Sequence, residues 1–200
     1  DYGDGVRDLT EKPVVVTRDD GYLRNYEYAY PTRKELDMKA TISVVGWSVG
    51  RSTHRIEGAD FFPHFSWAQA KEMYDSGLID IQNHSYDLHE GEDSKRYAAG
   101  PIEGETTGAH SDALIADTLK LEREIEEMVG NQVFSYTYPY GRYSLITEQV
   151  LADLDYRVTL STTSGVSLIK QGDPSSLFAL KRINAGPDIP SDRLVRLLSK

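Results

Sequence analysis

The sequence predicts an α/β fold in which helices alternate with the strands of a parallel sheet. Short apolar runs typical of buried strands recur along the 200 residues, and amphipathic segments with helix-capping residues separate most of them. The chain is 39% apolar and 27% charged, as in an ordinary globular protein. No repeat, low-complexity tract or linker interrupts it, so we expect a single domain over residues 1–200.

Capping and turn residues place the elements of the first half. Pro31 suits the first turn of a helix, Ser66 and Gln69 have the spacing of a capping box, and Gly77 suits a helix end. The predicted elements are a buried strand at 14–17 between Pro13 and Gly21, a helical segment to about 37, a strand at 40–45 ended by Gly46, a helix at 66–76 and a strand at 78–82.

The second half continues the alternation. Ser111 can cap a helix that Gly130 ends, with Leu114, Thr118, Leu121, Ile125 and Met128 on one face. The stretch from about 90 to 110 is rich in Glu, Asp and Gly, and a loop this long is usually functional or mobile. The remaining predicted elements are strands at 133–138, 156–161, 166–169 and 177–183, a helix from Ser144, and a last helix from Pro190 and Ser191.

Charge and composition narrow the function. The net charge is −10 and the pI is about 4.9, which disfavours a nucleic-acid partner. No apolar stretch has the length of a membrane span, and no signal peptide is visible. With no cysteine, any metal must be bound by His, Asp and Glu, as zinc or a related divalent ion can be.

Two acids and two imidazoles follow predicted strands. Asp19 and Asp20 end the first strand, His84 ends the third, and His89 lies five residues later. Neighbouring strand residues point to opposite faces, so the strand must break if both acids serve one site, and Gly21 permits that break. Taken alone, an Asp-Asp-Gly is usually a turn, but at two strand ends of an α/β protein this set predicts a one-metal hydrolytic site. Outside it, Ser85 and Asp87 are candidates to orient an imidazole, whereas His54, His64 and His110 are interpreted as surface or loop residues, with His110 a weak candidate.

These motifs resemble those of the polysaccharide deacetylase family, the NodB-homology group also called carbohydrate esterase family 4. Thr17 to Gly21 is similar to the family's Thr-Phe-Asp-Asp-Gly, and His84-Ser85 followed by His89 is similar to its second motif. The segment Pro139-Tyr140-Gly141 is similar to the end of its third motif. The resemblance covers nearly the whole chain.

The resemblance implies a distorted (β/α) barrel of parallel strands. It implies that Asp20, His84 and His89 bind a divalent metal, most often Zn²⁺, with Co²⁺ or Ni²⁺ as alternatives. It further implies that Asp19 is the general base and that the backbone N–H of Tyr140 helps to hold the oxyanion. The implied substrate is an acetylated polysaccharide, and the implied location is extracellular or cell-wall associated. Whether the domain belongs to a larger multidomain protein stays open.

Three positions depart from the family pattern. Arg18 replaces the Phe before the acids, and Thr137 replaces the Arg that opens the third motif. No histidine follows His110, so the late Leu-x-His motif, which carries the general acid, has no counterpart. Arg182, in the corresponding region, is a candidate to pair with Asp19.

The predicted reaction is hydrolysis of an acetyl group by a water that the metal activates. An amine leaves poorly without a proton donor, so the absent histidine favours O-acetyl esters, whereas the resemblance favours N-acetyl amides; both stay open. Two alternatives are a catalytically impaired carbohydrate-binding domain on the same fold and a hydrolase of small cyclic amides. The predicted substrate contacts are Tyr22, Trp47, Pro139 and Tyr140.

Overall fold

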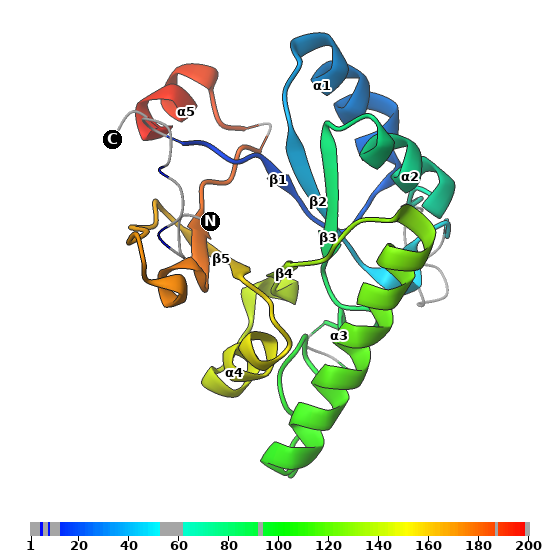
Figure 1. Cartoon of the computed structure of the whole chain (residues 1–200), viewed down its shortest axis with the longest axis vertical. Helices are drawn as coiled ribbons and strands as arrows, with labels where there is room; N and C mark the ends of the chain where they lie inside the picture. The colour runs from blue at the N-terminus through cyan, green and yellow to red at the C-terminus, as the bar shows by residue number, and fades with distance from the viewer. Residues whose placement is uncertain are drawn as a thin grey trace.

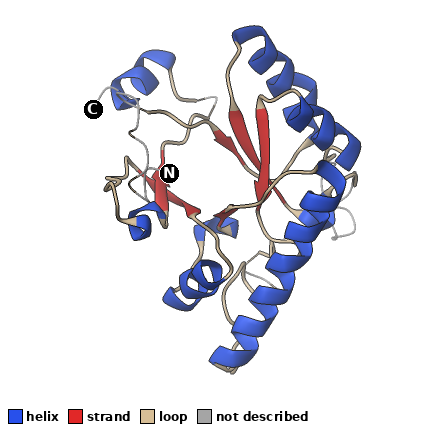
Figure 2. Ribbon diagram, viewed as in Figure 1, coloured by secondary structure: helices blue, strands red, loops and turns tan. Residues whose placement is uncertain are grey.

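The computed structural model describes residues 5, 8, 13–52, 62–91, 94–186 and 188–198. Six parallel strands form one sheet whose spatial order, β1 to β6, is also the order along the chain. Each connection therefore steps one strand further in the same direction, and the sheet curls into a half-barrel with helices on its outer side (Figures 1 and 2). This confirms the predicted barrel of parallel strands. The strands are β1 (Thr17–Arg18), β2 (Ala40–Val44), β3 (Ile79–Asn83), β4 (Ser135–Thr137), β5 (Val158–Ser164) and β6 (Leu180–Arg182).

The helices begin where the capping residues predict in three cases. Pro31 lies in the first turn of α1. Ser66 Oγ accepts from Gln69 N at 3.3 Å, and Ser66 N donates to Gln69 Oε1 at 2.8 Å, which completes the predicted capping box. Ser144 caps its helix in the same way. The helical elements are η1 (Asn25–Ala29), α1 (Tyr30–Leu36), η2 (Gly46–Ser48), α2 (Trp67–Asp75), α3 (Thr107–Val129), η3 (Pro139–Gly141), α4 (Leu145–Asp153), η4 (Pro174–Leu177) and α5 (Ser191–Leu198).

The main core lies between the sheet and the helices that cover it. Ile42, Ile81 and Tyr136 from the strands are buried with Leu121 and Ile125 of α3. Four of the five residues predicted for the inner face of α3 are buried, but Met128 is 48% exposed and Val129 packs inward in its place. Across the described ranges, no helix combines the length and apolarity that a bilayer span requires.

Three predictions differ most from the structure, in the burial, the start or the existence of an element. The strand at 14–17 is not buried, because Val14 and Val15 are 57% and 75% exposed and only Thr17 and Arg18 pair with β2. The helix predicted from Ser111 begins at Thr107, since Thr106 Oγ1 caps it by accepting from Ala109 N at 3.2 Å. Residues 166–169 are irregular instead of forming a strand.

Buried side-chain amides join β3 to β4, which pair directly only through Asn83 and Tyr136. Gln82 Oε1 accepts from the backbone N–H groups of Phe134 and Ser135 at 3.0 and 2.8 Å. Asn131 exchanges two hydrogen bonds with the backbone of Ile81, at 3.3 and 2.8 Å. These amides satisfy backbone groups that a wider strand pairing would otherwise satisfy.

Asp80 is the charged member of this junction. Its carboxylate accepts from Gln82 Nε2 at 3.1 Å, but burial outweighs the hydrogen bonds and raises the pKa of Asp80 to about 6. The ionised form is therefore less favourable in the folded chain than in the unfolded one.

We expect Asp80→Asn to stabilise the protein at pH 7 by about 1 kcal/mol, because the amide keeps an acceptor oxygen and removes the partly buried charge. The native carboxyl takes up a proton as the pH falls below its raised pKa of about 6, so the gain should fade between about pH 6 and pH 4. Urea unfolding at several pH values measures this. The control is Asp112→Asn, because Asp112 is exposed on α3; equal gains for both variants at pH 7 would contradict the assignment.

Candidate metal and active site

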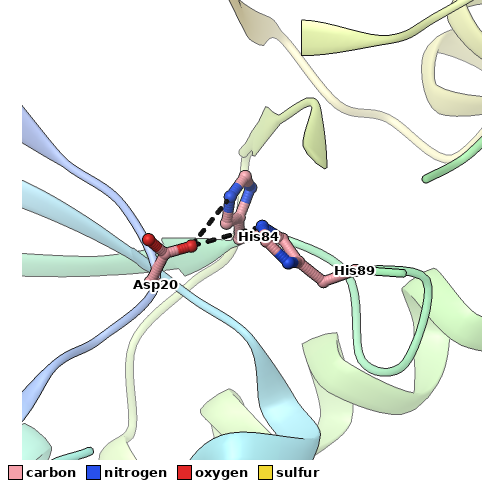
Figure 3. A group of neighbouring side chains, drawn as sticks. All are labelled: Asp20, His84 and His89. Carbon is pink, nitrogen blue, oxygen red and sulfur yellow. Dashed lines mark ion pairs between the residues drawn. The ribbon is translucent and has the colours of Figure 1, made fainter. Parts of the chain in front are cut away.

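Asp20, His84 and His89 converge at the carboxyl-terminal edge of the sheet (Figure 3). Asp20 follows β1, His84 follows β3, and His89 lies in the loop after it. Asp20 Oδ1 lies 3.4 Å from His84 Nε2 and 3.3 Å from His89 Nε2, and the three ligand-type atoms all lie within 4.8 Å of one another. Distant parts of the chain thus bring one carboxylate and two imidazoles to one point, as the sequence predicts.

The spacing of these atoms fits a small divalent cation. Zinc lies about 2.0–2.2 Å from nitrogen and carboxylate ligands, so neighbouring ligands of a tetrahedral ion are about 3.3–3.6 Å apart. The two distances from the Asp20 carboxylate, 3.4 and 3.3 Å, match that edge. One carboxylate and two imidazoles also form a donor set suited to zinc and related ions.

A break in the chain separates the two neighbouring aspartates. Asp20 and Gly21 have left-handed backbone conformations, with φ of 72° and 80°, and Gly21 N donates to Asp19 O at 3.0 Å. The strand therefore ends at Arg18, and the two carboxylates have separate partners. The break expected at Gly21 is present, although Asp20 itself takes part in it.

Arg182 holds the carboxylate of Asp19 from the far strand. Its Nη1 and Nη2 donate to Asp19 Oδ1 and Oδ2 at 2.7 and 2.8 Å, a bidentate pair, and its Nε donates to Ser161 O at 2.8 Å. Arg182 belongs to β6 and Asp19 follows β1, so this pair joins the first and last strands of the half-barrel. The pairing suggested for Arg182 from the sequence is present.

Burial and charge act in opposite directions on Asp20. Burial alone would raise its pKa, but the hydrogen bonds and charges of His84 and His89 outweigh burial and hold the pKa of Asp20 well below its ordinary value. Burial, followed by the nearby charge of Asp20, raises the pKa of Tyr22 to about 12. Asp20 is therefore ionised at neutral pH, and the Tyr22 hydroxyl keeps its proton.

A backbone carbonyl sets the tautomer of His84. His84 is 3% exposed, and its Nδ1 lies 2.7 Å from Thr137 O, which can only accept a hydrogen bond. Nδ1 therefore carries a proton, so Nε2, which faces Asp20 and His89, is the ring nitrogen left to bind a cation. The sequence pointed instead to Ser85 and Asp87 as orienting groups, and a backbone carbonyl from β4 leaves no side-chain signal that could have revealed it.

Asp117 of α3 holds the loop that carries both histidines. Its carboxylate accepts from the backbone N–H groups of Tyr86 and Asp87 at 2.8 and 2.7 Å. On the other side, Gly46 N donates to Ser85 O at 3.1 Å and Trp47 N donates to Tyr86 O at 2.8 Å. Sequence reasoning missed Asp117, because a lone acid in a long helix carries no motif.

The Pro139–Gly141 turn lies beside His89. Tyr140 and Gly141 have φ of 54° and 70°, and a Cβ on Gly141 would lie 2.0 Å from Thr162 Oγ1, so only glycine fits there. The Tyr140 ring is 47% exposed and its centroid is 4.6 Å from that of His89. Pro139 is buried, so it supports the turn and offers little surface to a substrate.

Tyr22 and Trp47, the other predicted substrate contacts, are both half-buried. The Tyr22 ring centroid lies 5.9 Å from that of Phe62 and 4.9 Å from that of His64. The guanidinium of Arg51 lies 4.5 Å from the centroid of the Trp47 ring. Side chains of this chain therefore already cover part of the surface of both rings.

Two of the histidines interpreted as surface or loop residues are buried, and His110 lies in α3, whereas His64 lies outside the helices and named strands. His64 and His110 are 9% and 2% exposed. His110 Nε2 lies 2.8 Å from Ala99 O and so ties α3 to the preceding loop. Arg96 and Glu105, 2.5 Å apart, join two parts of the same loop, in which Ala98 and Ala99 are buried and residues 101–104 are exposed. His54 lies outside the described residues.

An open barrel of parallel strands with its functional side chains at the carboxyl ends belongs to the broad class of α/β barrel proteins. Within that class, the sequence profile described as "Polysaccharide deacetylase" matches residues 6–159. The chain belongs to the polysaccharide deacetylase family.

Individual proteins agree with the family match. The chain is similar to a putative polysaccharide deacetylase, YxkH, of Bacillus subtilis, at 32% identity over 89% of this chain and 53% of that protein. It is 24% identical to the poly-β-1,6-N-acetyl-D-glucosamine N-deacetylase of Escherichia coli over 84% of this chain and 28% of that protein. The solved structure of IcaB from Ammonifex degensii superposes with a TM-score of 0.78 at 27% identity, covering 100% of this chain and 78% of that one. The chain thus spans about half or less of these two sequence relatives.

We expect Asp117→Ala to loosen the histidine loop, because the amides of Tyr86 and Asp87 would lose a charged acceptor. The loss should be about 1–3 kcal/mol of unfolding free energy. Hydrogen exchange should accelerate locally at residues 85–89. Mass spectrometry of exchanged peptides measures this, with Asp112→Ala on the exposed side of the same helix as control. Unchanged exchange at 85–89 would show that Asp117 does not hold the loop.

Proposed function

We propose that this chain is a metal-dependent deacetylase domain acting on an acetylated polysaccharide. Asp20, His84 and His89 would hold a divalent cation, with Zn²⁺ as the first candidate and Co²⁺ or Ni²⁺ as alternatives. The observation that carries the proposal is the separation of two adjacent carboxylates, one facing two imidazoles and the other paired with an arginine. Family membership supports the same reaction.

The roles of the residues follow from their contacts. When bound, a divalent cation lowers the pKa of a water and polarises the acetyl carbonyl. Asp19 would accept the proton of the attacking water. A carboxylate has about four acceptor sites, and Arg182 occupies two of them, so two remain for that proton. The backbone N–H of Tyr140 would donate to the oxyanion that forms.

Release of the leaving group is the step for which the chain lacks an evident donor, since no histidine follows His110. A sugar alkoxide can leave with a weak donor, whereas an amine needs a proton. Asp19 could return its proton to the nitrogen, which would allow amide cleavage. The relatives named as N-deacetylases of poly-β-1,6-N-acetyl-D-glucosamine favour the amide, so this polymer is the first substrate to test.

The setting of the domain is part of the proposal. Residues 1–200 are interpreted as one domain, and the partial coverage of its relatives is consistent with a larger parent protein. An acetylated polymer substrate suggests an extracellular or cell-wall location. Tyr140, exposed next to His89, is the strongest candidate for contact with a sugar ring.

The direct test measures acetate release from poly-N-acetylglucosamine, chitin or peptidoglycan fragments and acetylated xylan, side by side, with and without added Zn²⁺, Co²⁺ or Ni²⁺. We expect metal-stimulated release from at least one polymer. Sugar binding without turnover would favour the impaired carbohydrate-binding domain, to which the missing histidine points. Turnover of small cyclic amides alone would favour the third alternative.

Substitutions of the two aspartates should separate metal binding from chemistry. We expect Asp20→Ala to lose both bound metal and activity, as should His84→Ala, because each removes a ligand. Asp19→Asn should keep the metal and lose activity by about 10²-fold or more, because the amide cannot accept the proton. Metal content by atomic emission and acetate release measure the two effects. Normal turnover by Asp19→Asn would remove Asp19 from the role of base.

We expect Arg182 to affect turnover because it orients the carboxylate of Asp19. We expect Arg182→Lys to retain more activity than Arg182→Gln, because lysine keeps the charge but not the two-pronged geometry. Both variants should lower kcat and leave metal content unchanged. The matched control is Lys181→Gln, an exposed neighbour on the same strand. Wild-type kcat in Arg182→Gln would show that Asp19 needs no such partner.

A further inference from the structure

Three arginines line a groove in which none of the proposed metal ligands takes part. The groove has a volume of about 350 Å³ and lies between β1 and the helical segment η1–α1. Arg18 comes from β1, and Arg24 and Arg33 come from the helical segment, with Asn25, Tyr28 and Thr32 between them. Arg18 lines the groove with these helical residues, whereas the carboxylate of its neighbour Asp19 pairs with Arg182.

Among the described residues, the three guanidinium groups have no acidic partner, although the chain carries 32 acidic against 22 basic residues. Within the described part of the chain, no carboxylate forms an ion pair with Arg18, Arg24 or Arg33; the side chain of Arg33 instead contacts Met38 Sδ at 3.8 Å. By contrast, Arg96, Arg182 and Arg196 each pair with an acid. The groove is thus a local positive site in a protein of net charge −10.

The proximity of these arginines is electrostatically unfavourable, and a bound anion would remove the repulsion. Burial and the nearby charge of Arg18 both lower the pKa of Arg33, so the folded chain holds two like charges close together with reduced solvation. An oxyanion between them would replace repulsion with charge-assisted hydrogen bonds. Guanidinium groups suit this because each presents several donors in a planar fork that matches phosphate, sulfate or carboxylate.

The groove residues other than the arginines indicate which kind of molecule bears the anionic group. Tyr28 is 67% exposed at the groove, and exposed aromatic rings offer a flat apolar face to a sugar ring. Asn25, which is 6% exposed, also lines the groove. We propose that this groove binds an oxyanion group, phosphate or carboxylate, borne by an acidic polysaccharide. The proposal that the groove binds an anion does not depend on the proposed deacetylase activity. The proposal that a polysaccharide bears this anion does depend on that activity.

The test titrates the full chain with inorganic phosphate, a short oligogalacturonate and a neutral chitooligosaccharide at constant ionic strength, followed by calorimetry. We expect phosphate and oligogalacturonate to bind and the double variant Arg18→Gln/Arg33→Gln to weaken both by at least about tenfold. Arg157→Gln, an exposed arginine elsewhere, should bind as the parent does. Asp20→Ala should also bind normally, which separates the groove from phosphate held at the metal centre.

Several outcomes would overturn the proposal. Absence of binding by both anions, or equal binding by the double variant, would remove the groove as an anion site. Binding of phosphate but not of oligogalacturonate would overturn a carboxylate-bearing polysaccharide as carrier. Because calorimetry needs no turnover, failure of the deacetylase proposal would appear separately, as absent acetate release by a protein that still binds the anions. Circular dichroism of the double variant checks that it is folded.

Discussion

The left-handed backbone of Asp20 is the constraint on which the arrangement of the site depends. In a continuous strand, Asp19 and Asp20 would point to opposite faces of the sheet. The turn at Asp20 and Gly21 releases both side chains from that alternation. Asp20 then reaches the two imidazoles, and Asp19 reaches the arginine of the last strand. One backbone conformation therefore gives two chemically identical neighbours different electrostatic surroundings.

The surrounding fold makes these positions rigid by using backbone groups as well as side chains. The carbonyl of Thr137 in β4 sets His84, and the carboxylate of Asp117 holds the amides of the following loop. Arg182 links the open ends of the half-barrel through Asp19 and, at 3.4 Å, through Thr17 Oγ1. The Arg182–Asp19 pair thus both connects the two outer strands and places the proposed base. A shift of β6 relative to β1 would move Asp19 directly.

The sequence predicts what is local and leaves out what depends on distant packing. The capping box at Ser66, the helix start at Ser144 and the ligand-type residues after β1 and β3 can be identified because their signals lie within a few positions. Val14 and Val15 were predicted to be buried because they are apolar, yet they lie outside the paired part of β1. The burial of His64 and His110, and the roles of Thr137 O and Asp117, come from contacts across the fold that no single segment encodes. Arg182 is the exception among these long-range contacts. Because Thr137 replaces the arginine of the family pattern, the sequence itself directs attention to Arg182 as a partner of Asp19.

Besides Asp20, the site contains Ser85 and Tyr140 in the left-handed region, with φ of 70° and 54°. Such conformations cost a residue other than glycine about 1 kcal/mol or more. A laboratory selection for heat resistance alone would therefore enrich glycine at these positions. The selected proteins would be more stable and keep the same fold, but they would lack the Asp20 carboxylate and the Tyr140 ring beside the imidazoles. Engineers seeking a durable catalyst from this scaffold should direct mutagenesis to the exposed apolar run before β1 and leave these three positions unchanged.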